Sequence, residues 1–495
     1  MQFTSINFLI FFLTISSLYF IIPHKFRWIW LLICSYFFYM VSNPKYAICI
    51  ATSTIITYLS GLLINNANNI CNKKKSSQMK KLWVFASFSS NLGILFLFKY
   101  YNFFNDSLSR GLDLVGISSH MPSFEYLLPL GISFYTLQAL SYTVDVYRKD
   151  VLPEKNLGKY ALFVSFFPQV VAGPIEKSKN MLHQFEEKHV FNYNRIKNGL
   201  LLILWGIFVK IVVADRLAIL VNTVYHNPNN YKGFTTSIAT LFFTFQIYCD
   251  FMSYSDIARG AAEVLGFKVT NNFKQPYLSK SIKEFWSRWH VSLTSWFKDY
   301  LYFPLGGNGR GKLRSYYNIM IVFLVSGLWH GATFNFIIWG GLHGLYQVVE
   351  NLLKPFKTKA IKALNINTEI LSFKFLQVFI TFMLVNFAWI FFKASSFLAA
   401  ITIIKNVFYF NPWIFLDGSI FKLGLDLKDF LIAILGIALV LTVDIMRRTR
   451  NLRTQLSKQN IMFRWVTYVG AVAIILVLGL YGPGYSMQQF IYSQF

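Results

Sequence analysis

Two short stretches, residues 284–290 (EFWSRWH) and 325–332 (VSGLWHGA), decide how the rest of the chain is interpreted. Each places a histidine, His290 or His330, directly after a tryptophan in largely apolar sequence. An imidazole at membrane depth is costly unless it faces a protein interior or a wet cavity, so it is a functional candidate. Together, the two histidines predict a polar site in which both rings line one water-accessible passage.

The composition is that of a polytopic membrane protein. Of 495 residues, 55% are hydrophobic and only 14% are charged, which is too little polar surface for a soluble protein of this length. Lys and Arg number 47 against 21 Asp and Glu, a net charge of +26. The basic residues fall in short loops between apolar segments, where they orient helices rather than bind nucleic acid. We therefore expect no nucleic-acid partner.

The four cysteines are isolated and form no C-x-x-C pair, so we expect neither a redox pair nor a metal site. Residues 1–22 are apolar but lack a basic leading region and a small-residue cleavage site. They are interpreted as a retained first membrane span rather than a signal peptide.

Apolar segments near the length needed to cross a bilayer recur along the chain. Expected spans are residues 3–22, 27–41, 46–64, 82–98, 126–147, 194–224, 234–267, 371–392, 397–408, 430–446 and 466–480. The prediction is an all-α integral membrane fold of roughly 11 transmembrane helices plus re-entrant helices. It forms one polytopic domain over residues 1–495, with N-terminal spans in 1–125, a core in 126–352 and C-terminal spans in 353–495.

Three segments are expected to depart from simple spans. Residues 160–175 are short and broken by Pro168, Gly173 and Pro174, which favours a re-entrant segment. Residues 281–304 are too polar for a lipid-facing span and predict an amphipathic or re-entrant helix pair. Residues 316–352 carry several glycines and predict either one broken helix or two.

The lysine- and arginine-rich loops 65–81 and 447–464 are expected on the cytoplasmic side. Counting spans from them places the N-terminus and the C-terminus outside the cytoplasm, and residues 105–125 in an outer loop. No internal repeat is evident, which weakens a reading as an inverted-repeat transporter.

Motifs along nearly the whole chain resemble the membrane-bound O-acyltransferase superfamily, and within it the bacterial branch that acetylates alginate or peptidoglycan. The matching stretches are PLGISFY (129–135), DVYR (145–148), FFPQVVAGPI (166–175), YCDF (248–251), YSD (254–256), NF (272–273), PY (276–277), EFWSRWH (284–290), DYL (299–301), PLGG (304–307), GLWHGA (327–332) and FAWIFF (387–392).

The resemblance implies a helical wall around a central tunnel through a bacterial cytoplasmic (inner) membrane. Acetyl-CoA is then the cytoplasmic donor substrate, with no bound cofactor. The acetyl group leaves toward the outer face, where a separate extracytoplasmic acetyl-accepting transferase or esterase-like protein passes it to a polysaccharide. It also implies that His330 is the catalytic histidine and His290 the second required one.

The chemistry of acyl transfer explains why histidine suits this site. Transfer from a thioester to a hydroxyl needs a base for the hydroxyl proton and donors for the developing oxyanion. Imidazole titrates near working pH and can serve as the base. From the residues alone, His330 is as well explained as a core histidine that is hydrogen-bonded between helices. His290 remains open between base partner, oxyanion donor and structural ligand of a carboxylate.

Other polar and aromatic residues are assigned supporting roles. Asp299, Glu284 and Asp256 are expected to orient an imidazole or, more simply, to form ion pairs with Arg288 and Lys298. Trp329 is expected beside the tunnel because it adjoins His330, and Trp289 because it adjoins His290, although packing or an interfacial belt explains both equally. His343 is expected to be structural. The glycine-rich basic loop 306–312 is interpreted as a plain turn, with contact to CoA phosphates as the alternative.

The sequence thus predicts an integral membrane O-acetyltransferase that acts on a cell-envelope polysaccharide, either peptidoglycan or an alginate-like exopolysaccharide. Two alternatives stay open. A transporter or flippase of a lipid-linked sugar would use the buried ionisable residues as a proton relay. D-alanyl transfer to teichoic acid, within the same superfamily, would take its donor from an acyl-carrier protein.

Overall fold

A computed structural model of the chain describes residues 1–117, 122–124, 128–309, 311–481 and 489–491. All regular structure in these ranges is helical, which confirms the predicted all-α class. The chain divides into two compact units: unit 1 comprises residues 1–200 with 258–270, and unit 2 comprises residues 201–257 with the described residues from 271 to 491. The expected division after residues 125 and 352 stays a prediction.

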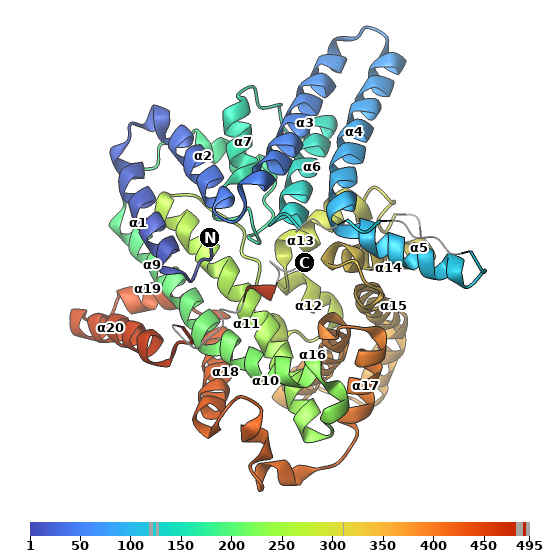
Figure 1. The fold of residues 1–495 in the computed structure, drawn as a ribbon, viewed down its shortest axis with the longest axis vertical. Coiled ribbons are helices and arrows are strands. Elements are labelled where there is room, and N and C mark those ends of the chain that lie inside the picture. The colour runs from blue at the N-terminus through green and yellow to red at the C-terminus, as the bar shows by residue number, and fades with distance from the viewer. Residues whose placement is uncertain (118–121, 125–127, 310, 482–488, 492–495) are drawn as a thin grey trace. The chain divides into compact units, whose positions relative to one another are not determined.

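The helices of the chain are shown in Figure 1. In order they are α1 (Ile6–Ile21), α2 (His24–Met40), α3 (Ala47–Asn66), α4 (Lys73–Leu95), α5 (Tyr101–Asp113), α6 (Ile132–Arg148), α7 (Leu157–Ser165), α8 (Ser178–Met181), α9 (Tyr193–Phe208), α10 (Asp215–His226), α11 (Phe234–Leu265), α12 (Ile282–Arg288), α13 (Val291–Phe297), α14 (Lys312–His330), α15 (Phe334–Ala363), α16 (Leu371–Lys393), α17 (Phe397–Val407), α18 (Leu427–Arg447), α19 (Leu452–Ser457) and α20 (Ile461–Leu478).

Five helical segments of the described chain are long and apolar enough to cross a membrane, which supports a multi-pass membrane protein. They are Pro44–Asn69, Lys73–Asp113, Leu371–Lys393, Leu427–Arg447 and Ile461–Leu478. Four overlap the expected spans 46–64, 371–392, 430–446 and 466–480, and the long second segment contains the expected span 82–98. The total of roughly 11 spans stays a prediction.

In unit 1, α3 and α4 run side by side as a hairpin and both pack against α6 (Figure 1). The expected loop 65–81 is too long, because α4 already begins at Lys73. The side chain of Asn72 accepts hydrogen bonds from the N–H groups of Lys74 and Lys75 and so caps this helix. The lysines therefore lie on the first turns of a membrane helix. The expected outer loop 105–125 is also partly wrong, since α5 continues to Asp113; residues 118–121 and 125 lie outside the described residues.

The segment 160–175 forms a short helix followed by irregular backbone. Helix α7 ends at Ser165, before the first proline, and the following Phe166 and Phe167 are fully buried. Gly131 has a left-handed backbone, and a Cβ there would collide with the carbonyl oxygen of Val170. Irregular backbone at membrane depth requires such cover by protein.

In unit 2, the polar stretch 281–304 forms the predicted helix pair, α12 and α13, each of seven residues. The glycine-rich stretch 316–352 is divided between two helices, because α14 ends at His330 and α15 begins at Phe334. Gly331 between them has an extended backbone (φ −166°, ψ 154°). His330 therefore lies at the end of one helix, immediately before a change of chain direction.

Helices α14 and α15 pack closely because glycines face each other where they cross. A Cβ on Gly327 would collide with the carbonyl oxygen of Phe336, and a Cβ on Gly340 with that of Phe323. Small residues at a membrane-helix interface allow this backbone contact. Gly341, one position further along α15, would place its Cβ in ordinary contact, 3.6 Å from Cδ2 of Leu324.

We expect Gly327→Ala and Gly340→Ala each to destabilise the protein by about 1–3 kcal/mol, because the backbones must move apart to admit the methyl group. The measurement is the thermal unfolding midpoint of purified protein in detergent. Gly341→Ala is the matched control and should leave the midpoint nearly unchanged. Equal midpoints for all three variants would contradict the close-contact explanation.

Candidate functional site

His330 ends α14 with its side chain buried, at 2% exposure. Its ring centroid lies 4.9 Å from that of Trp329, 4.9 Å from that of Trp339 and 5.5 Å from that of Phe392. These rings come from α14, α15 and α16, so three helices fix the position of the imidazole. Such a packed, largely apolar surround excludes bulk water from the ring.

His290 lies between α12 and α13 with a left-handed backbone, φ 43° and ψ 55°. This conformation is uncommon for a residue other than glycine, and such strain is often found at functional sites. The ring is fully buried and lies edge-on to Phe251, with the centroids 4.7 Å apart. His290 is thus a constrained residue in the core of unit 2.

Asn272 holds the backbone that follows His290 in place. Its carbonyl oxygen accepts a hydrogen bond from the N–H of Val291 (3.1 Å), and its Oδ1 accepts one from the N–H of Ser292 (3.1 Å). Those N–H groups belong to the first turn of α13, which needs outside acceptors. Asn272 is fully buried, and its Nδ2 has no hydrogen-bond partner within the described structure.

The indole of Trp329 contacts both histidines. Its ring centroid lies 6.2 Å from that of His290 and 4.9 Å from that of His330. Both histidines of the sequence motifs therefore lie next to one side chain, that of Trp329. Their shared water-accessible passage stays a prediction, since the residues that line the large cavity nearby do not include either histidine.

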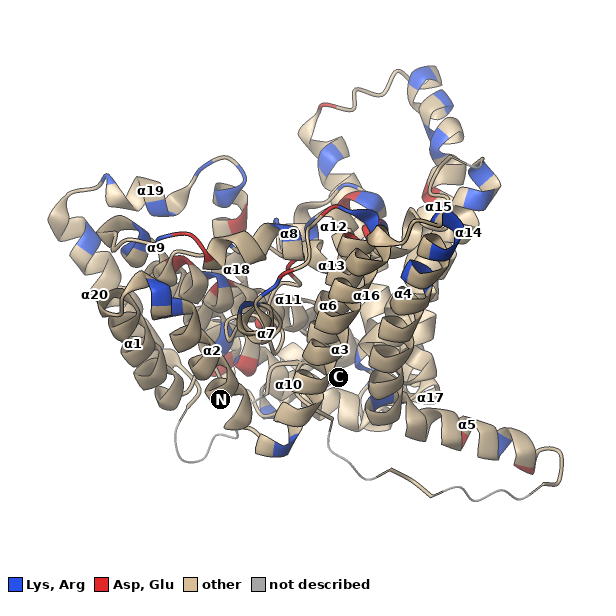
Figure 2. Ribbon diagram, turned by 90° about the horizontal axis from the view of Figure 1, so that it is seen from above, with Lys and Arg blue, Asp and Glu red and all other residues tan. Residues whose placement is uncertain are grey.

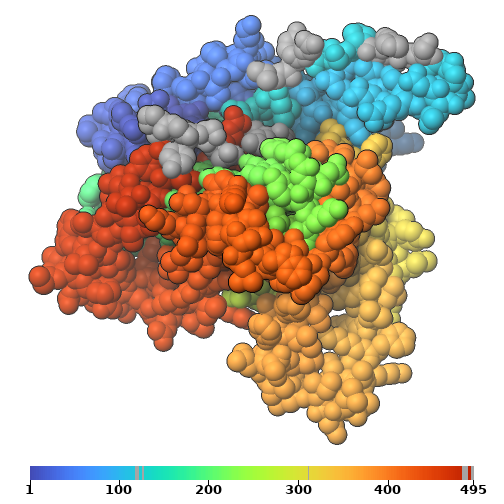
Figure 3. Space-filling model, turned by 60° about the horizontal axis from the view of Figure 1, so that its bottom comes forward, coloured from blue at the N-terminus to red at the C-terminus, as the bar shows by residue number. Residues whose placement is uncertain are grey.

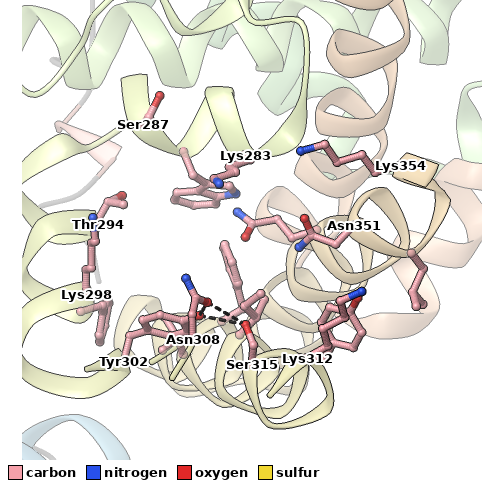
Figure 4. Close-up of a pocket in the computed structure, with 18 of the residues that line it drawn as sticks. Lys283, Ser287, Thr294, Lys298, Tyr302, Asn308, Lys312, Ser315, Asn351 and Lys354 are labelled. Carbon is pink, nitrogen blue, oxygen red and sulfur yellow. Dashed lines mark hydrogen bonds between the residues drawn. The ribbon is translucent and has the colours of Figure 1, made fainter. Parts of the chain in front are cut away.

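A cavity of about 1370 Å³ lies in unit 2 among α12, α13, α14 and α15 (Figure 4). Four lysines line it: Lys283, Lys298, Lys312 and Lys354. Polar side chains, including those of Tyr302, Asn308, Ser315 and Asn351, add hydrogen-bonding groups. None of its described lining residues is Asp or Glu, so the cavity suits a negatively charged ligand.

The same cavity has an apolar part, lined by residues that include Leu293, Phe297, Ile319, Val322 and Phe323. It also reaches Thr294, four residues after His290, and Ser326, four residues before His330. The N–H of Thr294 donates to the carbonyl oxygen of His290 (3.0 Å). The cavity thus extends to the helical turns next to both histidines.

Basic residues gather around this region of unit 2, as the blue segments of α14 and α15 in Figure 2 show. The segment around residues 350–370, light orange in Figure 3, includes the C-terminal part of α15 and projects beyond the darker orange segment that follows it. Lys354 on this part lines the cavity, whereas Lys357 and Lys359 do not.

Two of the three acidic residues expected to support the histidines, Glu284 and Asp256, form ion pairs. Glu284 Oε1 lies 2.6 Å from a guanidinium nitrogen of Arg288, one helical turn away, as anticipated. Asp256 pairs instead with Arg447 of α18, with Oδ2 and the guanidinium nitrogen 3.5 Å apart, rather than with Arg288 or Lys298. Asp299 lies in the π-helical turn after α13. Trp289 is fully buried and packs on Phe285 and Trp389. These contacts fit packing, which the sequence analysis gave as the alternative to a place beside the tunnel.

Two features of the site, Asn272 and Trp339, were not predicted from the sequence. Asn272 was noted only as part of a motif, and nothing local to it indicates that it reaches α13. Trp339 lies nine positions beyond His330 on another helix. His343 accepts a hydrogen bond at Nδ1 from the indole N–H of Trp286 (3.2 Å), which fits the structural role expected for it. The described residues hold no cluster of metal ligands.

Comparisons with known proteins all point to acyltransferases. Residues 73–393 match the model of the membrane-bound O-acyltransferase family. This range includes both histidines and all described residues that line the cavity. A protein named probable alginate O-acetylase from Pseudomonas putida is 35% identical, over 91% of this chain and 89% of its own. A peptidoglycan O-acetyltransferase from Helicobacter pylori is 33% identical, over 77% of this chain and 74% of its own. A teichoic acid D-alanyltransferase from Streptococcus thermophilus is 28% identical, over 49% of this chain and 67% of its own.

The geometry around His290 yields a test of stability. We expect Asn272→Ala to cost about 1–3 kcal/mol, because the buried N–H of Ser292 loses the acceptor that Asn272 provides. Asn271→Ala, which removes the neighbouring and less buried amide, is the control and should lower the midpoint less. The measurement is again the thermal unfolding midpoint in detergent. Equal loss in both variants would show that the acceptor oxygen does not hold the turn.

Proposed function

Because the chain belongs to the membrane-bound O-acyltransferase family, we propose that it is an O-acetyltransferase that takes acetyl from acetyl-CoA for O-acetylation of a cell-envelope polysaccharide. One observation carries the proposal: the lysine-lined cavity of unit 2 reaches Thr294 and Ser326, each four residues from one of the two histidines. This arrangement supports an anionic donor in the cavity with its reactive end directed toward His290 and His330.

The relatives favour acetyl as the transferred group. Those that match most of this chain are named alginate O-acetylase or peptidoglycan O-acetyltransferase, whereas the D-alanyltransferase matches about half of it. Alginate-like exopolysaccharide and peptidoglycan are both compatible with this similarity. We therefore assign the final acceptor as the hydroxyl of an envelope polysaccharide without choosing between the two.

The cavity suits the chemistry of CoA. Lysine ammonium groups bind phosphate as point charges, and the four cavity lysines face no carboxylate among the described lining residues. The apolar part, with Ile319, Val322 and Phe323, suits the less polar pantetheine arm. In this arrangement the phosphates lie among the lysines and the thioester lies toward Ser326 and Thr294.

We assign the base to His330. Its imidazole takes the proton of the acceptor hydroxyl as the hydroxyl oxygen forms a bond to the thioester carbonyl carbon. The C–S bond then breaks, and the thiolate leaves and recovers the proton as the CoA thiol. The buried surround of His330 excludes water, which would otherwise hydrolyse the thioester.

His290 and Trp339 are assigned supporting roles. The strained turn at His290, held by Asn272, fixes its ring beside Trp329. The indole N–H of Trp339 is a buried donor without a hydrogen-bond partner among the described residues, and its ring contacts that of His330. A donor so placed is available to a developing oxyanion.

We infer the direction of transfer from the distribution of charge. The basic ends of the membrane helices are assigned to the cytoplasmic side, where CoA is found, and both termini are assigned to the other side. The membrane is then the bacterial cytoplasmic membrane. An extracytoplasmic protein receives the acetyl group and passes it to the polysaccharide.

The base assignment predicts that His330→Gln lowers the rate of acetyl transfer by about 10²- to 10⁴-fold, because glutamine fills similar space but cannot take the proton. The measurement is release of free CoA from acetyl-CoA by purified protein with acceptor. His343→Gln, which also removes a buried imidazole of unit 2, is the matched control and should retain transfer. A folded His330→Gln protein with normal rates would overturn the assignment.

The donor assignment predicts that Lys283→Gln, Lys298→Gln and Lys312→Gln each raise the KM for acetyl-CoA several-fold and change kcat little, since they remove binding common to ground and transition states. Lys359→Gln, an exposed α15 lysine outside the cavity, is the control and should leave KM unchanged.

The same assay separates the alternatives. Turnover only with a D-alanyl carrier protein would favour the teichoic acid reaction, and no thioester cleavage with any donor would favour a transporter.

A further inference from the structure

A second basic hollow lies in unit 1, in a part of the chain that the proposed reaction does not use. It has a volume of about 480 Å³ and is lined by Asn68, Ile70, Lys73, Ser76, Ser77, Lys80, Tyr147 and Lys149. These residues come from the turn between α3 and α4, the first two turns of α4, and the end of α6. Three elements packed on one another therefore form it.

The charge of this hollow is unbalanced. Its lining contains Lys73, Lys80 and Lys149 but neither Asp nor Glu. Within the described ranges, none of the three lysines forms an ion pair with a carboxylate. Ammonium groups gathered in this way repel one another until an anion joins them. The hydroxyl groups of Ser77 and Tyr147 can donate further hydrogen bonds to such an anion.

Lys149 occupies a position where glycine would cost less. It ends α6 with a left-handed backbone, φ 66° and ψ 24°, which helices usually reach with glycine. A residue with a Cβ is strained in this conformation. Its side chain lines the hollow, so a function for the ammonium group there accounts for a lysine at this place.

The location of the hollow indicates where the anion comes from. It lies at the end of two membrane-span helices, Pro44–Asn69 and Lys73–Asp113, whose apolar side chains include exposed Ile55, Leu59 and Leu82. The end of a span is the depth at which phospholipid headgroups lie. Basic pockets between transmembrane helices are suited to anionic headgroups.

We propose that this hollow binds the phosphate of an anionic phospholipid headgroup, held by Lys73, Lys80 and Lys149. The Asn72 side chain already occupies the first free N–H groups of α4, so lysine and hydroxyl side chains supply the binding rather than the helix end. The lipid then joins the α3–α4 hairpin to α6 and neutralises their facing charges.

The experiment measures the thermal unfolding midpoint of the full-length protein in a neutral detergent. It compares added phosphatidylglycerol, phosphatidylcholine with the same acyl chains, and inorganic phosphate. Phosphatidylglycerol should raise the midpoint of the wild-type protein in a saturable manner, and the other two should not.

The variant with Lys73→Gln, Lys80→Gln and Lys149→Gly should lose this response. Each lysine contributes a factor of about five, so the apparent affinity should fall by about a hundredfold. Glycine suits the backbone at position 149, so this change does not impair folding by itself.

The matched control carries Lys74→Gln, Lys75→Gln and Lys81→Gln, which removes the same charge from lysines of α4 outside the hollow. It should keep the response. An equal loss of the midpoint rise in both variants would mean that the lipid response depends only on net charge, and this would overturn the proposed site. An equal response to inorganic phosphate would overturn the lipid as its source, and no response to phosphatidylglycerol would overturn the proposal.

Discussion

In unit 2, the backbones of α14 and α15 touch where the two helices cross, and this contact positions the residues around His330. Glycines at 327 and 340 allow the two helices to touch where any side chain would separate them. That contact brings Trp339 of α15 against His330 at the end of α14. It also sets the spacing of the cavity walls, since α14 supplies Ile319 and Ser326 and α15 supplies Gln347 and Asn351. Helix association in a membrane relies on such packing because lipid gives apolar surfaces little reason to associate.

A second constraint acts on the other histidine. His290 keeps a left-handed backbone, which persists only where surrounding structure determines it. Asn272 supplies that structure through two hydrogen bonds to the first turn of α13. Because Trp329 contacts both rings, the strained turn and the helix crossing are joined through one indole. A shift of the turn at His290 or of the α14–α15 crossing would therefore change the contacts of both histidine rings with Trp329.

The excess of basic residues has a local as well as a global meaning. Two hollows, one in each unit, are lined by lysines and by no acidic residue among those described. Carboxylates near several of the other basic residues form ion pairs: the buried Lys210 lies between Asp215 (2.8 Å) and Asp250 (2.6 Å), and the partly exposed Glu284 pairs with Arg288. Buried charges need partners, whereas lysines bordering a hollow remain available for an anionic ligand.

Features that depend on neighbours along the chain could be predicted from the sequence. Apolar runs predicted membrane helices, the polar stretch 281–304 predicted a helix pair, and the motifs around His290 and His330 predicted the family. The Glu284–Arg288 pair was also foreseeable, because residues four apart share a helix face. The start of α4 was predicted too late, because the lysines at 73–75 resemble a loop in composition, although they form the first turn of a helix capped by Asn72.

Contacts between distant parts of the chain could not be predicted in this way and are seen in the fold. Asp256 pairs with Arg447, Asn272 holds the turn after His290, and Trp339 packs on His330, and none of these partners is marked by spacing. The two lysine-lined hollows likewise combine residues from separate helices. The physical reason is that periodicity reports which face of a helix is apolar, whereas the partner of a buried polar group depends on how helices cross.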